Sequence, residues 1–466
     1  MKLRLLQNLK FGEKVAEEEE DLPSYFVETS YWFEIFKGTK DVVYGAKGSG
    51  KSAIFSVLLS KKIKSKLFND KRVLLIAAEN IKDDPVFKKY GERLPVTEQG
   101  FELLWKLYFL ELVGEMLVER ERTYGLPSQI SKEVIKDLKK HGLISVEKPS
   151  SLGDLLRRAI ESVREVEIES FDLGGVELDP LSQSPSYRLP KINFRKQNRQ
   201  KKTLPPISDL LKKINRALEE LDLNVWIVID HLDVAFAKSD EREGNALRAL
   251  FTVYKDLNEL LVSKRLVPKI FLRDDIWARI TKGGYREATR VVRDTRITWT
   301  AELLFNLIIR RLLHNNSIAT AYRIDPAQVL ASEQKQWEFF HRIFPTHVED
   351  GRGKHKTFEW MLDSIRDGTG RATPRELIHL LSSARDAQVK RLLIGINEPP
   401  GETLFESEAL KQSLEDVSRE RLNKTLYAEY PHLREHINSL ERNRPRQTAK
   451  ALAKKWEISE EQAIES

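Results

Sequence analysis

Short apolar runs and longer amphipathic segments alternate through the first two thirds of the chain. The runs at 42–44, 72–78, 225–229 and 268–272 are almost continuously apolar. A strand that is apolar on both faces is typical of a parallel sheet covered by helices on both sides, whereas a half-exposed strand alternates. The pattern therefore predicts an α/β fold with a parallel sheet, whose last strand we expect at Arg296–Thr300.

Segments with the 3.6-residue period of helices separate these runs. One helix is expected at 53–66, directly after the first run. From 95 to 205 the alternation stops: 99–120 and 151–165 have helical periodicity, and 170–206 is rich in Ser, Pro, Gly and Asn. We therefore predict that 95–205 is an insertion, mostly helical with a flexible segment.

The pattern beyond residue 300 is wholly helical. Outside the insertion and the 53–66 helix, helices are expected at 207–221, 245–263, 301–313, 333–343, 355–367, 373–390 and 407–426. This gives a predicted organisation of an N-terminal segment (1–40), a core (41–300) interrupted by the insertion, a helical lid (301–440) and a tail (441–466).

The stretch after the first apolar run carries the strongest chemical signal. Gly45, four further residues, Gly50, Lys51 and Ser52 form G-x-x-x-x-G-K-[ST] between a strand-like run and a helix-like one. Glycines let the backbone wrap round a phosphate with its N–H groups pointing inward, while the lysine reaches the β- and γ-phosphates and the hydroxyl holds Mg²⁺. The sequence predicts a triphosphate site formed by Gly45, Ala46, Lys47, Gly48, Ser49, Gly50, Lys51, Ser52 and Ala53.

A later run supplies a carboxylate. The apolar run 225–229 ends in Asp230, as expected of a central parallel strand that delivers a carboxylate to Mg²⁺, the second signature of P-loop NTPases. Ser52 and Asp230 are therefore the predicted metal ligands, and at least one further strand lies between the two motifs in the chain. No guanine-reading N-K-x-D follows a late strand, so ATP is the expected nucleotide.

Several arginines are candidates to sense the γ-phosphate. Arg273, with Asp274 as the alternative, follows the run at 268–272 and would lie at the carboxyl edge of the sheet, where sheets of this kind bind ligands. Arg371 and Arg375 flank the start of an expected lid helix with Thr373 as its cap, and would contact the nucleotide from the lid.

A further group of arginines suggests a homo-oligomer. Among the arginines from 286 to 296, Arg290 or Arg293 is the expected finger, acting in a neighbouring subunit on the transition-state charge. Surface ion pairs or phosphate contacts are the alternative for these side chains.

The composition narrows the classes of protein. Hydrophobic residues at 41% and charged ones at 32% are typical of a globular chain. No apolar stretch approaches the length of a membrane span, the N-terminus lacks a signal-peptide core, and the absence of cysteine excludes disulfides and thiolate-bound zinc. The histidines show no paired metal spacing. We expect a cytoplasmic protein without membrane contact.

Two basic segments are candidates for nucleic-acid contact, which the net charge of +7 permits. Arg188–Lys202 contains no acidic residue, with Tyr187 and Phe194 placed to stack on bases; a solvated basic loop is the alternative. Thr448–Ile464 has the pattern of helix, short turn and helix with Ser459 as a cap, which resembles a helix-turn-helix without a wing; ordinary helical packing is the alternative.

The N-terminal segment has two notable features. The acidic run Glu17–Asp21 is expected to be a solvated helix face. Tyr31 and Trp32, shortly before the first strand, would pack either on an adenine ring or in the core.

Together these motifs resemble the ASCE branch of P-loop ATPases, which includes AAA+ and STAND proteins. Closer still, the chain resembles the bacterial P-loop ATPases named after the cyanobacterial protein Sll1717. The likeness is carried by F-V-E-T-S-Y-W (26–32), V-Y-G-A-K-G-S-G-K-S-A-I (43–54), K-I-F-L-R-D-D-I (269–276) and T-P-R-E-L-I (373–378). The resemblance implies a nucleotide-driven ATPase with a helical lid; many such relatives are thought to act in phage defence or stress beside an effector protein.

One residue departs from the AAA+ pattern. Where those proteins usually carry the glutamate that polarises the attacking water, this chain has His231. Asp233, in a D-x-x-D arrangement similar to that of STAND-like and KAP-like ATPases, is the expected substitute, and Glu79 is the runner-up. Slow hydrolysis, with the nucleotide used as a conformational switch, is therefore the expectation.

The expected function is an ATP-binding and hydrolysing P-loop ATPase, coupled to nucleic acid or to an effector protein, with Lys51, Asp230, Asp233 and Arg273 as its catalytic residues. Two alternatives stay open. One is a non-hydrolytic, nucleotide-gated scaffold that assembles a partner protein, and the other is a DNA-binding regulator.

Overall fold

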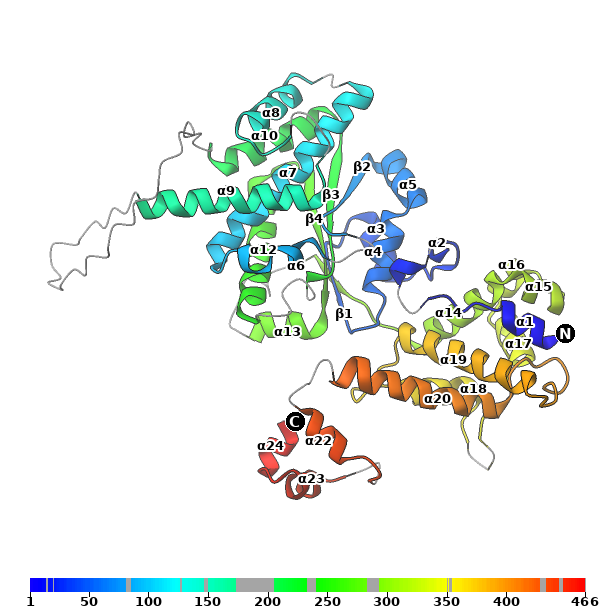
Figure 1. The fold of residues 1–466 in the computed structure, drawn as a ribbon. Helices are drawn as coiled ribbons and strands as arrows, with labels where there is room; N and C mark the ends of the chain where they lie inside the picture. Colours follow the sequence, from blue (N-terminus) through cyan, green and yellow to red (C-terminus); the bar gives the residue numbers. More distant parts are fainter. Residues whose placement is uncertain are drawn as a thin grey trace. The chain divides into compact units, whose positions relative to one another are not determined.

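The computed structural model describes residues 1–13, 16–19, 21–80, 85–125, 128–145, 150–172, 205–232, 240–282, 293–349, 351, 354–427, 433–443 and 447–465. The chain divides into two compact units (Figure 1). One, the sheet unit, is Val15–Thr298; the other, the helical unit, is Met1–Lys14 with Trp299–Ser466.

The sheet unit is built on five parallel strands. These are β1 (Val42–Gly45), β2 (Val73–Ala77), β3 (Asn224–Ile229), β4 (Leu266–Arg273) and β5 (Asp294–Arg296), in the order β2-β3-β4-β1-β5. The predicted α/β fold with a parallel sheet is confirmed. Within the sheet, β4 separates β1 from β3.

The last strand was predicted a few residues too late. β5 ends at Arg296, because Thr300 is the N-cap of α14 (Ala301–His314) and its hydroxyl accepts the N–H of Leu303 at 3.3 Å. A residue that caps a helix has already left the strand.

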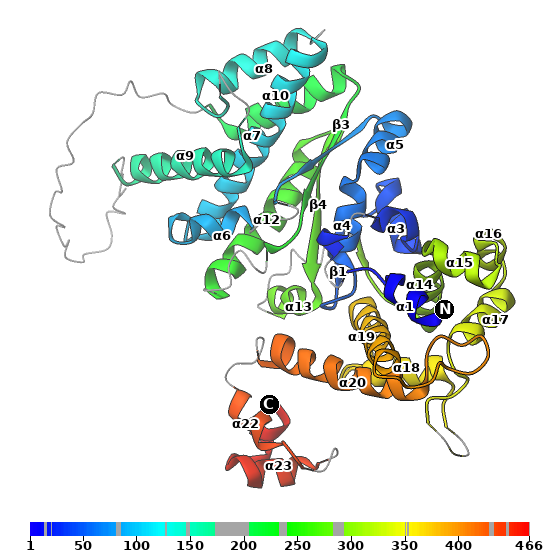
Figure 2. The same cartoon turned by 45° about the vertical axis from the view of Figure 1, so that its right-hand side comes forward.

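Helices cover both faces of the sheet. Figures 1 and 2 show α7 and α12 on one side and α3, α4 and α5 on the other. The helices of this unit are α2 (Leu22–Tyr25), α3 (Ser30–Lys37), α4 (Lys51–Leu59), α5 (Lys61–Lys71), α6 (Val86–Tyr90), α7 (Glu98–Tyr124), α8 (Gln129–Lys140), α9 (Leu152–Asp172), α10 (Ile207–Glu220), α12 (Asp240–Leu260) and α13 (Asp274–Lys282), with short 3₁₀ turns η1 (Ala16–Glu18) and η2 (Gly91–Arg93). The single helix predicted at 53–66 is two helices, because Ser60 is extended (ψ 147°) and its hydroxyl donates to the carbonyl of Val57.

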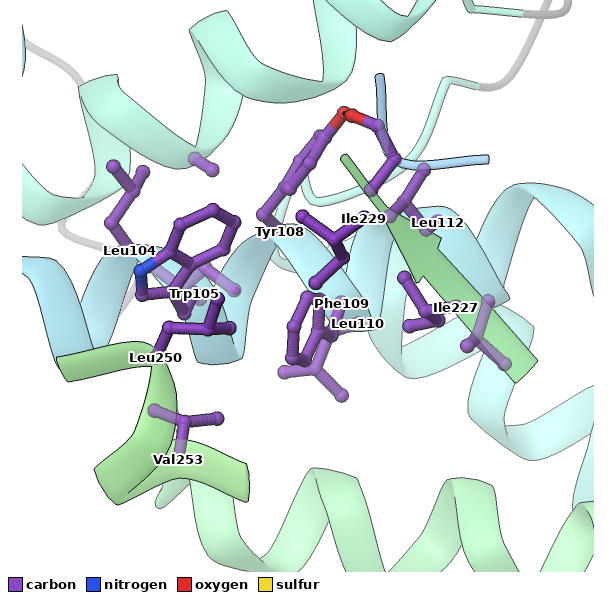
Figure 3. Packing of buried hydrophobic residues seen from close by; sticks show 14 of the residues in the cluster. Leu104, Trp105, Tyr108, Phe109, Leu110, Leu112, Ile227, Ile229, Leu250 and Val253 are labelled. Atoms are coloured by element: carbon purple, nitrogen blue, oxygen red, sulfur yellow. Dashed lines mark hydrogen bonds between the residues drawn. The ribbon is translucent and has the colours of Figure 1, made fainter. Parts of the chain in front are cut away.

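The helix α7 forms the centre of the core on one face. Its side chains Trp105 and Tyr108 are fully buried, in the same apolar cluster as Ile227 and Ile229 of β3 (Figure 3). Both polar tips are satisfied, because Trp105 Nε1 donates to the carbonyl of Ala246 at 2.9 Å and the Tyr108 hydroxyl donates to that of Ala78 at 2.7 Å. The described helices of the predicted insertion thus share one apolar core with the sheet.

The helical unit contains α1 (Lys2–Asn8), α14, α15 (Asn316–Tyr322), α16 (Pro326–Leu330), α17 (Glu333–Ile343), α18 (Thr357–Ile365), α19 (Pro374–Leu393), α20 (Ser407–Arg421) with the π-helical turn η4 (Leu422–Leu426), α22 (Arg434–Ser439), α23 (Ala449–Trp456) and α24 (Glu460–Glu465). Residues 1–13 pack in this unit, where Arg385 donates to the carbonyl of Leu9 at 2.9 Å. Residues 16–40 that are described belong to the sheet unit.

The tail has the helix, turn and helix predicted for 448–464. Thr448 caps α23 by accepting the N–H of Ala451, and Ser459 precedes α24, where its hydroxyl accepts the N–H of Gln462 at 3.1 Å. Trp456 Nε1 donates to the Ser439 hydroxyl at 3.0 Å, so α22 packs against α23. Among the described residues, no helix combines the length and the apolar character needed to cross a membrane.

Candidate functional site

The loop between β1 and α4 has a backbone that requires glycine. Gly48 and Gly50 have φ values of 79° and 95°, in the left-handed region that side chains disfavour. At Gly45, a Cβ would lie 2.6 Å from Ser49 Oγ and 3.1 Å from Ile297 Cβ. Gly48 and Gly50 are therefore favoured by the backbone conformation of the loop, and Gly45 by its close contact with Ser49 and Ile297.

The helix α4 begins where this loop ends. Its N-cap is Gly50, which offers no side-chain acceptor, so the first-turn N–H groups of Lys51, Ser52 and Ala53 face the loop without a capping side chain. The Lys51 ammonium folds back and donates to the carbonyls of Gly45 and Ala46, at 2.9 and 3.0 Å. A helix N-terminus without a capping side chain and a cation next to the loop are features that bind a phosphate.

A second strand brings its polar residues to the same place. Asp230 directly follows β3 and is 4% exposed. The next residue, His231, has φ 62°, a conformation that histidine adopts more readily than bulkier residues and that turns the chain sharply after the strand. Its Nε2 lies 3.4 Å from Ser52 Oγ, and its Nδ1 lies 3.8 Å from Asp230 Oδ2. The structure thus brings the Ser52 hydroxyl and the end of β3 together through His231.

Glu17 completes this cluster, contrary to the expectation from the sequence. Its carboxylate oxygen Oε1 lies 2.9 Å from His231 Nε2, and its side chain is only 12% exposed. The acidic run was expected to be a solvated face, yet this member of it points inward. Glu17, Asp230 and His231 each offer a ligand atom, all within 4.8 Å of one another.

The pKa of Glu17 is lowered in this setting. Burial alone would raise the pKa, but hydrogen bonds from His231, from the Glu17 backbone and from the Ser52 hydroxyl favour the carboxylate more strongly. Glu17 therefore stays anionic at neutral pH. No sequence motif predicted a role for Glu17, because only the folding of the N-terminal segment brings this residue next to His231.

Glu79, the runner-up for the water-polarising acid, is fully buried after β2. Its carboxylate accepts the backbone N–H groups of Val86 at 2.5 Å and Phe87 at 3.4 Å, so it caps α6. Burial raises the pKa of Glu79 to about 7, against the opposing effect of these hydrogen bonds and of His231. Both carboxylate oxygens of Glu79 therefore accept backbone N–H groups at the start of α6, which favours a structural role for this residue.

Arg273 lies at the carboxyl end of β4, in register with Gly45 on the neighbouring strand. Its guanidinium makes a two-point contact with Asp275, at 3.0 and 2.8 Å. Asp274, the alternative candidate at this strand end, pairs with Arg296 at 2.6 Å. Arg273 is thus beside the loop, held by a carboxylate two residues further along its own chain.

The other predicted residues lie elsewhere. Arg293 forms an ion pair with Asp41 at 2.7 Å, at the start of β1 and so at the opposite end of that strand from the loop. This is the ion-pair alternative given for these arginines, and a role as a finger in a neighbouring subunit stays a prediction. Tyr31 and Trp32 are 5% and 2% exposed, and Trp32 packs on Phe26, so both are core residues.

Arg371 and Arg375 are exposed residues of the helical unit, on either side of the start of α19. Several predictions fall outside the described residues. These are Asp233, Arg286, Arg290 and the basic segment Arg188–Lys202 with its flanking Tyr187.

Comparisons with protein-family models, with curated proteins and with solved structures found no match to this chain.

Proposed function

We propose that the chain binds ATP with Mg²⁺ at the β1–α4 loop and hydrolyses it. One observation carries the proposal: the glycine-dependent loop leads directly into a helix N-terminus, and the Lys51 ammonium lies against the loop carbonyls. Such a loop presents backbone N–H groups and one cation to the β- and γ-phosphates. Because β1 and β3 are parallel strands of one sheet, the loop after β1 and Asp230 after β3 come to the same edge of that sheet.

The donors around the loop fit Mg²⁺, which prefers oxygen ligands. Ser52 Oγ and the Asp230 carboxylate would hold the ion, directly or through water, and the bound ion would neutralise charge on the phosphates. Lys51 would bind the β- and γ-phosphates, and Arg273, if it exchanges Asp275 for the γ-phosphate, would respond to whether that group is present.

The proposal is tested by two measurements on the full chain, equilibrium binding of Mg·ATP and steady-state phosphate release. Wild type should bind the nucleotide and release phosphate, whereas Lys51→Ala should do neither while melting at a similar temperature. The assay is run with and without DNA, because coupling to nucleic acid through the basic segment is part of the expectation.

Two results would reject parts of the proposal. If wild type does not bind Mg·ATP, the loop is not a nucleotide site. If it binds but releases no more phosphate than Lys51→Ala, with or without DNA, the protein is a nucleotide-gated scaffold and not an ATPase.

A further inference from the structure

The carboxylate of Glu17 lies inside the proposed nucleotide site although it comes from a separate segment of the chain. Its Oε1 is 2.9 Å from His231 Nε2, which itself lies 3.4 Å from Ser52 Oγ. The 3₁₀ turn that carries it, η1, packs against α4. Glu17 is thus held close to Ser52, a proposed Mg²⁺ ligand, and most of the Glu17 side chain is buried.

A carboxylate at this position could act as the hydrogen-bond acceptor for the attacking water. Hydrolysis requires a group that accepts a hydrogen bond from the attacking water and polarises it. The residue directly after Asp230 is a histidine, and Asp233, the carboxylate expected from the sequence, lies outside the described residues. The oxygens of Glu79, the runner-up, accept the N–H groups of Val86 and Phe87. Glu17 is a described residue that brings a carboxylate to this site from the turn η1 and not from the end of a strand.

We propose that Glu17 is the catalytic carboxylate of this site and that His231 is its positioning residue; this inference rests on the proposed ATPase function. His231 Nε2 is the donor to Glu17 Oε1, because an ionised carboxylate only accepts, and the several lone pairs of the carboxylate let it also accept a hydrogen bond from the water. The imidazole is itself oriented, because Phe55 of α4 meets it edge-on at 6.3 Å between ring centroids. The left-handed backbone at His231 turns the ring toward Ser52 and Glu17.

The step balances without a further reagent. The water oxygen forms a bond to the γ-phosphorus while the bond from that phosphorus to the β,γ-bridging oxygen breaks, and the electron pair leaves with ADP. The proton lost by the water passes to the Glu17 carboxylate and then to the phosphate product or to solvent. Glu17 is regenerated for the next turnover.

The test compares Glu17→Gln with its neighbour Glu18→Gln, since Glu18 is on the same turn and outside the cluster around His231. Mg·ATP binding and single-turnover hydrolysis are measured for both and for wild type. Glu17→Gln should bind within about threefold of wild type and hydrolyse about 10²-fold or more slowly, which is the usual contribution of a general base. Glu18→Gln should match wild type in both.

Other outcomes reject the inference separately from the proposed function. Hydrolysis by Glu17→Gln at the wild-type rate, or faster, would overturn it, and a faster rate would identify Glu17 as an inhibitory contact. Loss of Mg·ATP binding in Glu17→Gln would overturn it in favour of a metal ligand. If Glu17→Gln does not fold, Glu17→Asp is used, and a wild-type rate for that shortened carboxylate also counts against the proposal. Wild type that does not hydrolyse ATP rejects the proposed ATPase function itself.

The positioning role of His231 has its own readout. His231→Gln keeps a side-chain N–H donor for Glu17, whereas His231→Ala removes it. Both should leave KM close to wild type, but kcat should fall in His231→Ala and be partly restored in His231→Gln. Equal rates for the two variants would mean that the hydrogen bond to Glu17 does not position the carboxylate.

Discussion

Lys269 of β4 donates a 2.6 Å hydrogen bond to Asp41, and both side chains are 1% exposed. The Tyr254 hydroxyl donates to the other carboxylate oxygen at 2.8 Å, and the Arg293 guanidinium lies against it. Lys269 also lies 4.2 Å from the centroid of the Trp226 ring. This network joins β3, β4 and the start of β1, at the end of β1 away from the loop.

Asp41→Ala should destabilise the protein strongly. It leaves the Lys269 cation buried without its carboxylate, and breaking one side of a buried ion pair typically costs about 3–5 kcal/mol. Burial already lowers the pKa of Lys269 to about 8 against the pull of Asp41. Urea unfolding followed by tryptophan fluorescence measures the loss.

The matched control is Asp416→Ala, which breaks the pair between Arg419 and the 59%-exposed carboxylate of Asp416 at 3.6 Å. An exposed pair contributes about 0–1 kcal/mol. If the two variants lose the same free energy of unfolding, the buried network is not what holds these strands together.

Periodicity predicted β1, β3 and β4 because these strands are largely buried and therefore largely apolar. The strands at 42–45 and 224–229 lie within a residue or two of their predicted bounds. The loop at 45–52 was equally predictable from the sequence, since its glycines are required by backbone geometry.

The position of Glu17 was not predictable, because it depends on a contact with His231 that is made only in the folded chain. Likewise nothing in the sequence marks Ser60 as the residue that divides one helix into two.

Glu79 should make the stability of the protein depend on pH. Its folded-state pKa is about 7, above the ordinary value of 4.5, so the folded state retains a proton that the unfolded chain loses between these values. Stability from this group is therefore full below pH 4.5 and is lost as pH rises through 7. Glu79→Gln removes the titration, so its stability relative to wild type should rise by up to roughly 3 kcal/mol between about pH 4.5 and about pH 8.

Urea unfolding of both proteins across this pH range gives the comparison. Glu219→Gln, on an exposed position of α10, is the control and should follow wild type. A constant difference between Glu79→Gln and wild type at every pH would contradict the prediction.

Gly45→Ala should disable the loop. The added Cβ would approach Ser49 Oγ to 2.6 Å and Ile297 Cβ to 3.1 Å, so the loop or the chain after β5 must shift. Overpacking of this kind costs about 1–3 kcal/mol, and the displaced carbonyl of residue 45 is one that Lys51 contacts. Mg·ATP binding, measured by calorimetry, should fall below detection. Gly368→Ala, where no atom lies within 4 Å of the new Cβ, should bind as wild type does.

Removal of Mg²⁺ should distinguish the contribution of the two predicted metal ligands, Ser52 and Asp230, to ATP binding from that of the phosphate-binding loop. At about a hundredfold excess over its dissociation constant, Mg·ATP should stabilise wild type by about 2.7 kcal/mol, seen as a higher melting temperature. Chelation with EDTA should abolish most of this gain, and Ser52→Ala should lose it even with Mg²⁺ present. Ser56→Ala, one turn further along α4, is the control, because its hydroxyl is not part of the cluster around His231. A melting temperature raised equally by ATP with and without Mg²⁺ would show that the loop holds the nucleotide without the ion, and that Ser52 and Asp230 serve the fold and not a metal.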